Sequence, residues 1–287
     1  MPHRILITGA GGQLATALNR LLEGHYELRS VGEFEAAGPV CDLTDWKQVR
    51  ETVAAYKPTI IINTAALTNV DLNESEPELA ATINTRGVEY LISASEKYGT
   101  KLVQISTDYV FDGSAGPYLE VDPTNPINVY GQTKLDGDLL ALEHPRNLVV
   151  RANVLYGGKD GSAASFVRWV IRSLQAGETI QIVDDQVNNP TLTDHLVQAI
   201  NAAIDQDGAG LYNYGGLEFI DRYAFACRIA HQFGLPTGLI EPIKTSALKQ
   251  LAPRPLSSGL ICSKMIVDFG VMNYDIEDSL EYGFGLN

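Results

Sequence analysis

The stretch that decides the fold is Thr8-Gly9-Ala10-Gly11-Gly12-Gln13-Leu14-Ala15, which lies between an apolar run at 4–8 and a helical pattern at 13–23. A glycine-rich turn between a strand and a helix is the context expected of a dinucleotide-binding motif. Gly9 suits a tight turn, Gly12 lets the backbone approach a pyrophosphate, and Ala15 allows close packing of the helix on the strand. The free amides at the start of that helix would attract the phosphates.

The alternation of short apolar runs with helical patterns continues well beyond this motif. It predicts an α/β fold, a doubly wound parallel (Rossmann) sheet over residues 1–155. We expect a smaller, interleaved C-terminal lobe over 156–287 that binds substrate and in part returns to the first domain, with a ligand cleft between the two. The expected strands are 4–8, 27–31, 59–63, 101–106, 147–151 and 180–183, and the expected helices are 13–23, 45–56, 77–98, 130–142, 163–176, 193–204 and 223–233.

Composition excludes several classes of function. The chain has 35 acidic and 21 basic residues, a formal charge of −14 and a pI near 4.7, which argues against nucleic-acid and membrane partners. No apolar run reaches the length of a membrane span, and we see no secretion signal at the N-terminus. Cys41, Cys227 and Cys262 are scattered and lack metal-ligand spacing, as expected of reduced thiols in a cytoplasmic protein without a metal site.

The end of the second expected strand bears on the choice of cofactor. Glu33 follows that strand and would bind a ribose 2′-hydroxyl but repel a 2′-phosphate, whereas Arg29 within the strand would attract the phosphate. We therefore expect NADH or NADPH and favour NADH. Asp42 and Leu43 are candidates for contact with the adenine, although they fit the start of the next helix equally well.

The clearest chemical signal is Tyr130-Gly131-Gln132-Thr133-Lys134, because residues four apart share one face of a helix. An ammonium beside a phenol favours the phenolate, so we expect Lys134 to lower the pKa of Tyr130. Tyr130 could then donate a proton to a carbonyl oxygen during hydride transfer. Thr107 follows a strongly apolar strand, at the carboxyl end of the sheet, and is placed to donate a hydrogen bond to the same oxygen.

Together the glycine turn, the run Ser106-Thr107-Asp108-Tyr109-Val110-Phe111-Asp112-Gly113 and the Tyr130–Lys134 pair resemble the extended short-chain dehydrogenase/reductases. Within that superfamily the chain is similar to the dTDP-4-dehydrorhamnose reductases over nearly its whole length. The resemblance implies NAD(P)H-dependent reduction of the C4 keto group of a nucleotide-activated 6-deoxy sugar, as in the step from dTDP-4-dehydrorhamnose to dTDP-L-rhamnose. It implies Thr107, Tyr130 and Lys134 as catalytic residues and a contact of Asp108 with the sugar.

We expect the remaining site residues in two groups. The cofactor group is Gly9, Gly12, Gln13, Leu14, Glu33, Asp42, Leu43, Thr64, Ala65 and Ala66, together with Tyr130 and Lys134. The substrate group is Thr107, Asp108, Asn153, Val154, Asn189 and Arg254. Arg254, between two prolines, would clamp a diphosphate, and Asn189 either lines the sugar side or only forms a turn. The histidines are assigned no role, and the acidic clusters are read as solvated faces.

Two residues differ from the family pattern, and these differences bear on the reaction and on the substrate. Other stretches of the sequence leave alternative functions open. Tyr109 stands where the related dehydratases have a catalytic glutamate, so dehydration is not expected. Val154 stands where the reductases usually have an aromatic residue that contacts the sugar. Residues 130–137 and 155–157 also resemble the regulatory beta subunit of methionine adenosyltransferase, a non-catalytic binding protein. The other alternative function is that of a sugar-nucleotide epimerase. For the assembly, we expect a homodimer as a possibility to test.

Overall fold

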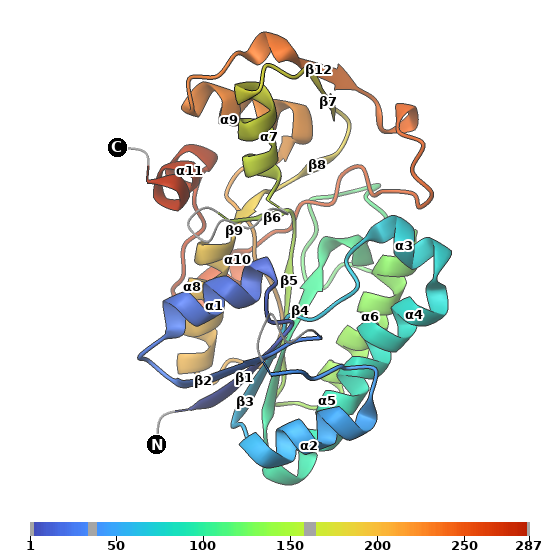
Figure 1. The fold of residues 1–287 in the computed structure, drawn as a ribbon, viewed down its shortest axis with the longest axis vertical. Helices are drawn as coiled ribbons and strands as arrows, with labels where there is room; N and C mark the ends of the chain where they lie inside the picture. Colours follow the sequence, from blue (N-terminus) through green and yellow to red (C-terminus); the bar gives the residue numbers. More distant parts are fainter. Residues whose placement is uncertain (1–2, 34–38, 158–164, 286–287) are drawn as a thin grey trace.

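A six-stranded parallel sheet forms the base of the molecule in the computed structural model, which describes residues 3–33, 39–157 and 165–285 (Figure 1). The strand order is β10-β5-β4-β3-β1-β2, and every neighbouring pair is parallel. The strands are β1 (Arg4–Thr8), β2 (Glu27–Val31), β3 (Ile60–Asn63), β4 (Lys101–Thr107), β5 (Leu148–Ala152) and β10 (Gly210–Asn213). The predicted doubly wound fold is confirmed, with the order reversing between β1 and β3.

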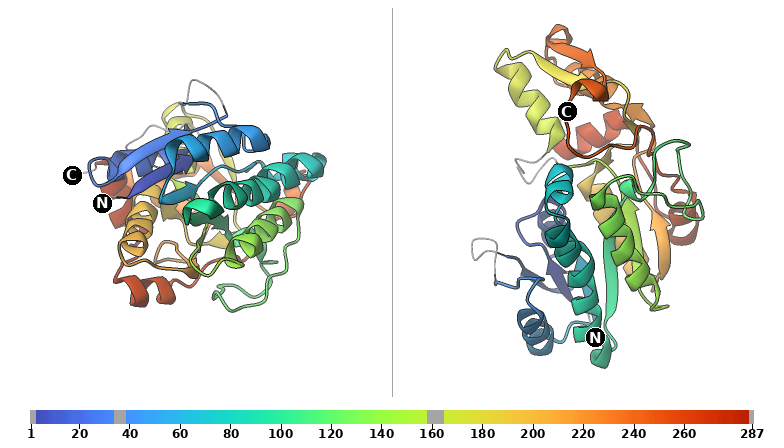
Figure 2. Two further views of the ribbon diagram at one scale, coloured as in Figure 1. Left: turned by 90° about the horizontal axis from the view of Figure 1, so that it is seen from below. Right: turned by 90° about the vertical axis from the view of Figure 1, so that its right-hand side faces the viewer.

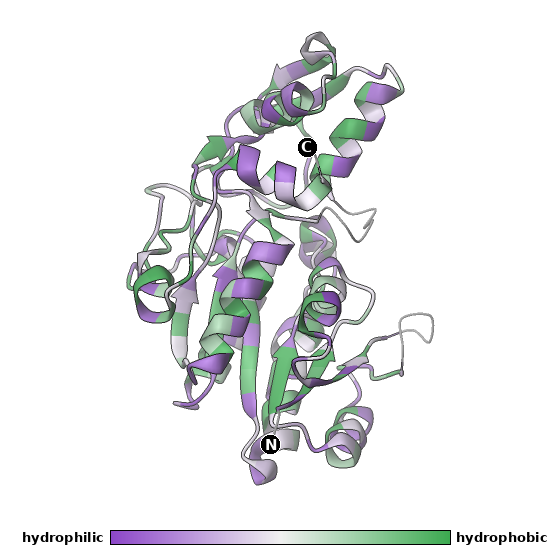
Figure 3. Cartoon of the chain, turned by 90° about the vertical axis from the view of Figure 1, so that its left-hand side faces the viewer, coloured by the Kyte–Doolittle hydropathy of each residue, from purple (hydrophilic) through white to green (hydrophobic). Residues whose placement is uncertain are grey.

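Both faces of the sheet are covered by helices because successive strand residues point to opposite sides. Ile5 and Ile7 join one core with α1 (Gln13–Leu22), α8 (Thr193–Asp205) and α10 (Ser263–Phe269). Leu6 joins the other core, beneath α2 (Trp46–Tyr56), α5 (Gly87–Ser95) and α6 (Val129–Leu142). The green of hydrophobic residues covers much of the sheet in Figure 3.

The single helix predicted over 77–98 is interrupted. The structure has α3 (Val70–Ser75), α4 (Pro77–Ala81), a π turn (Thr82–Arg86), α5 and a 3-10 turn (Glu96–Tyr98). The π turn carries Asn84, whose side chain accepts a hydrogen bond from the Leu67 amide at 2.8 Å and donates to Thr133 Oγ1 of α6 at 3.1 Å. These tertiary hydrogen bonds, which helical periodicity does not reveal, accompany the change of helix type.

A smaller lobe lies beyond the carboxyl ends of the strands (Figure 2, right). Its core packs α7 (Phe166–Gln175), α9 (Arg222–Gln232) and α11 (Ile276–Phe284) on the parallel pair β7 (Ile180–Val183) and β12 (Ile240–Ile243). Two short pairs accompany them, β6 (Leu155–Tyr156) with β9 (Thr191–Leu192), and β8 (Val187–Asn188) with β11 (Ile220–Asp221). Residues 163 and 164 of the helix predicted over 163–176 lie outside the described residues.

The chain passes between the two lobes more than once. After the first short strands of the smaller lobe it returns through α8 and β10 to the sheet, and later it returns again through α10 (Figure 1). Of the helices in the described ranges, none combines the length and apolar character needed to cross a bilayer.

Candidate active site

A cleft of about 560 Å³ lies at the carboxyl ends of β1, β3, β4 and β5, facing the smaller lobe. This is the crevice where the strand order reverses, the usual ligand position in doubly wound sheets. The predicted residues that line it are Gly9, Gly12, Gln13, Leu14, Thr64, Ala65, Ala66, Thr107, Asp108, Tyr130, Lys134, Asn153 and Val154.

The glycine turn after β1 fits a bound pyrophosphate. Gly9 and Gly11 have φ of 75° and 87°, and a Cβ on Gly9 would lie 2.8 Å from the Ala65 amide nitrogen. Gly12 is the N-cap of α1, and the first turn of that helix carries no acidic residue. The first amides of α1 therefore face the cleft without a competing negative side chain, as a phosphate site requires.

Three of the predicted cofactor residues do not line this cleft. Glu33 is exposed just beyond β2, while Leu43 is buried against Gly87. Asp42 accepts hydrogen bonds from the amide and hydroxyl of Thr44, both at 2.8 Å, so it forms the turn before α2. The turn interpretation of Asp42 therefore describes its geometry better than contact with an adenine in this cleft.

Arg29 is held away from the end of β2, since its guanidinium lies 4.5 Å from the centre of the Tyr56 ring. It therefore offers no cation at the carboxyl end of that strand. Among the described residues, Glu33 is the first charged residue along the chain after β2.

Thr107 and Tyr130 come together because β4 ends where α6 begins. Both side chains line the cleft, and the Thr107 hydroxyl affects the pKa of the Tyr130 phenol. Asn128 caps α6 by accepting from the Gly131 amide at 2.8 Å. A Cβ on Gly131 would lie 2.1 Å from the Tyr109 carbonyl oxygen, so glycine at this position is what allows the helix to approach the turn after β4.

The prediction that the pKa of Tyr130 is lowered is wrong. Burial raises this pKa well above its usual value, and the Thr107 hydroxyl opposes the rise. Lys134 Nζ instead donates to the Ile105 carbonyl at 2.6 Å, and burial lowers the pKa of the ammonium itself. Tyr130 therefore keeps its proton at neutral pH, which is the form a general acid needs.

Asp108 is buried beside Thr107, and desolvation raises its pKa to about 6. Thr107 Oγ1 donates to one of its oxygens at 3.2 Å, and Ser258 Oγ donates to the other at 2.5 Å. Tyr109 packs edge-on against Tyr130 with ring centres 5.5 Å apart. The end of β4 is therefore followed by a carboxyl group whose pKa burial raises to about 6.

Two of the predicted substrate residues do not line the cleft and instead bind other parts of the chain. Arg254 is absent from the lining of the cleft, because its guanidinium pairs with Asp71 at 3.0 Å and donates to the Ala252 carbonyl at 2.7 Å. Asn189 is fully buried and donates to the carbonyls of Gly216 and Leu260. Its side-chain oxygen accepts from Asn153, so the structure gives Asn189 a role in joining segments rather than a face on the cleft.

The sequence analysis missed a charged residue of the cleft. Arg222, the first residue of α9, reaches the cleft from the smaller lobe, and its charge acts on both Asp108 and Tyr109. Its guanidinium carbon lies 5.6 Å from the centre of the Phe166 ring. No spacing in the sequence links Arg222 to the strand ends, because it reaches the site only through the packing of the two lobes.

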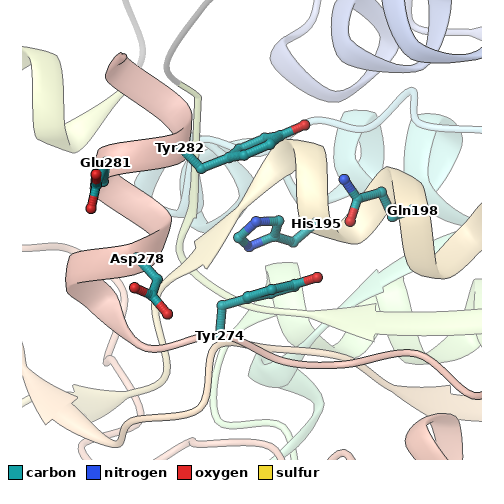
Figure 4. A pocket seen from close by; sticks show the side chains of 6 residues that line it. All are labelled: His195, Gln198, Tyr274, Asp278, Glu281 and Tyr282. Atoms are coloured by element: carbon teal, nitrogen blue, oxygen red, sulfur yellow. The ribbon is translucent and has the colours of Figure 1, made fainter. Parts of the chain in front are cut away.

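A separate cavity of about 370 Å³ contains none of these residues (Figure 4). His195 lies between Tyr274 and Tyr282 there, at 3.9 and 5.3 Å between ring centres, and burial lowers its pKa to about 4. The cavity also exposes Asp278 and Glu281 of α11. His195 is therefore neutral at pH 7.

Three acidic side chains lie close together in the smaller lobe. Within the described ranges, Glu218, Asp275 and Glu277 bring carboxylate oxygens within 4.8 Å of one another. Arg228 forms ion pairs with Glu218, at 3.2 Å, and with Glu277. The arginine therefore neutralises part of this group.

Comparison with known proteins gives consistent results. Residues 3–282 match the family model described as RmlD substrate binding domain. The chain is 34% identical to the dTDP-4-dehydrorhamnose reductase of Escherichia coli K12, over 93% of this chain and 92% of that one. It is 33% identical to methionine adenosyltransferase 2 subunit beta of Danio rerio, over 92% and 84% of the two chains.

Solved structures extend the likeness. A dTDP-4-dehydrorhamnose reductase from Bacillus anthracis in complex with NADP superimposes with a TM-score of 0.91 at 32% identity, covering 99% of both chains. The corresponding protein from Clostridium acetobutylicum gives 0.90 at 33% identity, covering 98% of both chains.

Proposed function

This chain belongs to the RmlD substrate binding domain family, and we propose that it is an NAD(P)H-dependent reductase of a nucleotide-activated 4-keto-6-deoxy sugar, forming dTDP-L-rhamnose from dTDP-4-dehydrorhamnose. The observation that carries the proposal is the meeting of Thr107, Tyr130 and Lys134 in the cleft beside the glycine turn. Reduction of a carbonyl needs a proton donor and a hydrogen-bond donor to the developing oxyanion, and these side chains supply both.

Different residues of the chain bind the cofactor and donate hydrogen bonds or a proton to the substrate. The glycine turn and the first amides of α1 hold the dinucleotide diphosphate, and the bound nicotinamide supplies the hydride. Tyr130 donates its proton to the C4 oxygen, and Thr107 donates a hydrogen bond to the same oxygen. Lys134 binds the ribose next to the nicotinamide, with its ammonium already fixed against Ile105.

Arg222 and Asp108 act on the substrate side. Arg222 enters from the smaller lobe and is, with Lys134, one of two cationic residues on the described lining, so it suits a sugar diphosphate in an otherwise acidic protein. Asp108, with a pKa of about 6, suits a hydrogen bond to a sugar hydroxyl. Tyr109 leaves the position of the dehydratase glutamate without a carboxylate, in keeping with reduction as the chemistry.

A regulatory subunit of methionine adenosyltransferase is the second candidate, since the Danio rerio beta subunit is 33% identical over most of both chains. The complete set of Thr107, Tyr130 and Lys134 favours the enzyme. The preference for NADH suggested by Glu33, a cytoplasmic location and a homodimer belong to the same proposal.

The test is to mix the purified protein with NADH or NADPH, add dTDP-4-dehydro-6-deoxy-L-mannose and follow the loss of reduced-nicotinamide absorbance. We expect oxidation that requires the sugar, and the ratio of the two rates ranks the cofactors. Cofactor binding without oxidation would contradict the proposal, and co-purification with a methionine adenosyltransferase catalytic subunit would then support the regulatory role.

A further inference from the structure

Three charged side chains are buried together behind the catalytic wall. Lys134 and Asp138 lie one turn apart on α6, and Arg151 lies on β5, with exposed fractions of 3%, 0% and 3%. Burying ions is costly, and well-packed apolar residues would often be as stable as such a group. The buried charges therefore call for an explanation other than stability.

Asp138 is the centre of this group. Its Oδ2 accepts a hydrogen bond from Ser106 Oγ at 2.6 Å and lies 3.5 Å from Arg151 Nε. Ser106 and Arg151 are paired in register on the adjacent strands β4 and β5. Ser106 also stands between Ile105, whose carbonyl holds Lys134 Nζ, and Thr107 of the catalytic wall.

The charges decide where the proton resides. Burial raises the pKa of Asp138 and lowers the pKa of Lys134, so an isolated pair could exchange a proton and become neutral. Arg151 prevents this because a guanidinium stays protonated and favours the carboxylate form of Asp138. The carboxylate in turn raises the pKa of Lys134 against the effect of burial.

Among the charged groups of the described chain, Asp138 is the one that raises the pKa of Lys134. Other charged and titratable groups do occur on every element packed against α6. These groups, together with those on α6 itself, are Asp71, Glu74, Glu78, Arg86, Glu89, Tyr90, Lys101, Asp108, Tyr109, Tyr130, Asp136 and Arg151.

We propose that Asp138 is a positioning residue that keeps Lys134 charged, while Arg151 keeps Asp138 ionised. The proposal rests on the proposed function for its catalytic meaning, since Lys134 is the residue expected to bind the nicotinamide ribose. The charge state of Lys134, however, can be measured without any turnover.

The direct test is a pH titration of Lys134 by NMR in the protein labelled with 13C at the lysine ε-carbons, with the resonance assigned from a Lys134→Arg variant. In the native protein we expect the ammonium shift of Lys134 to persist at pH 8. A neutral Lys134 at pH 7 would overturn the proposal, and this arm needs no variant of Asp138.

Asp138→Asn keeps the shape and an acceptor for Ser106 but removes the charge. We expect its Lys134 resonance to titrate at least about one pH unit lower than in the native protein, the usual effect of losing a neighbouring opposite charge. Asp136→Asn is the matched control, because Asp136 lies on the same helix and contacts Gln132 in an exposed position. An unchanged midpoint in folded Asp138→Asn, or an equal shift in Asp136→Asn, would refute the proposal.

Two more variants separate charge from hydrogen bonding. Asp138→Glu should retain the native titration, and Ser106→Ala should also retain it, because the carboxylate is still present.

The pH dependence of the reaction rate is a secondary measurement, since Asp138 also raises the pKa of Tyr130. If the native protein fails to reduce the sugar, the proposed function fails while the lysine titration still decides the role of Asp138.

Discussion

The wall of the cleft formed by β4 and α6 is fixed by hydrogen bonds between regular elements, whereas the opposite wall consists of single side chains at the start of a helix and at the junction between the lobes. On the first wall, Lys134 Nζ donates to the Ile105 carbonyl of β4, and the Asn128 side chain caps the start of α6. On the second, Arg222 stands at the first residue of a helix, and Val154, at the junction with the smaller lobe, has a left-handed φ of 38°.

This difference separates chemistry from recognition. A proton donor must be placed to within a fraction of an ångström, and rigid elements achieve this. Residues that recognise a substrate can vary from one family member to another without disturbing the sheet. We therefore expect substitutions on the first wall to reduce turnover and substitutions on the second wall to change substrate affinity.

Tyr130→Phe should have the largest effect. It removes the proton donor and should lower kcat by a factor of about 10² or more, because general acid catalysis contributes this much. Cofactor affinity, measured by fluorescence titration, should change little. Tyr109→Phe is the matched control on the neighbouring ring, and near-native turnover of Tyr130→Phe would remove Tyr130 from the mechanism.

Arg222→Ala tests the second wall. Loss of a charge-assisted contact to a diphosphate should raise KM for the nucleotide sugar about 10- to 100-fold and leave kcat within a few-fold. Arg254→Ala is the comparison, because Asp71 already holds that guanidinium. A larger rise in KM for Arg254→Ala than for Arg222→Ala would reverse the assignment of the diphosphate contact.

Gly9→Ala should destabilise the protein by about 1–3 kcal/mol and weaken cofactor binding, because the new Cβ would clash with the Ala65 backbone. Gly24→Ala shares a positive φ of 82° but meets no atom within 4 Å, so it isolates the backbone strain. Urea unfolding and cofactor titration of the two variants measure the difference. Equal losses of stability would show that the close approach at Gly9 contributes nothing.

Val154→Gly should have the smallest effect, a gain of about 1 kcal/mol in the free energy of unfolding, because a β-branched residue is strained at positive φ. The wider cleft should also change KM for the sugar. Lys57→Gly, at a φ of 51° on the exposed end of α2, should give a similar stabilisation with no change in KM. A Val154→Gly variant that loses stability would show that side-chain packing outweighs the strain.

The sequence predicted five of the six strands of the sheet and missed β10, which joins the sheet only after part of the smaller lobe. The prediction succeeded where strands and helices alternate locally, and the carboxyl ends of parallel strands meet at one edge. That geometry is why the amino-acid pattern by itself places Thr107 and Tyr130 at the same edge. Arg222 could not be placed, because its position depends on how the lobes pack. The same holds for Asp138 and Arg151, whose pairing across α6 and β5 follows no periodic signal.

Strand β10 has a consequence for the order in which the protein can form. It covers the outer side of β5, pairing over residues 148–151, yet it is encoded after several elements of the smaller lobe. During synthesis β5 therefore remains an open edge, a template for wrong pairing, until residue 213 has left the ribosome. A fragment that stops at residue 155 would carry this open edge permanently, so we expect it to aggregate rather than serve as an independent nucleotide-binding module.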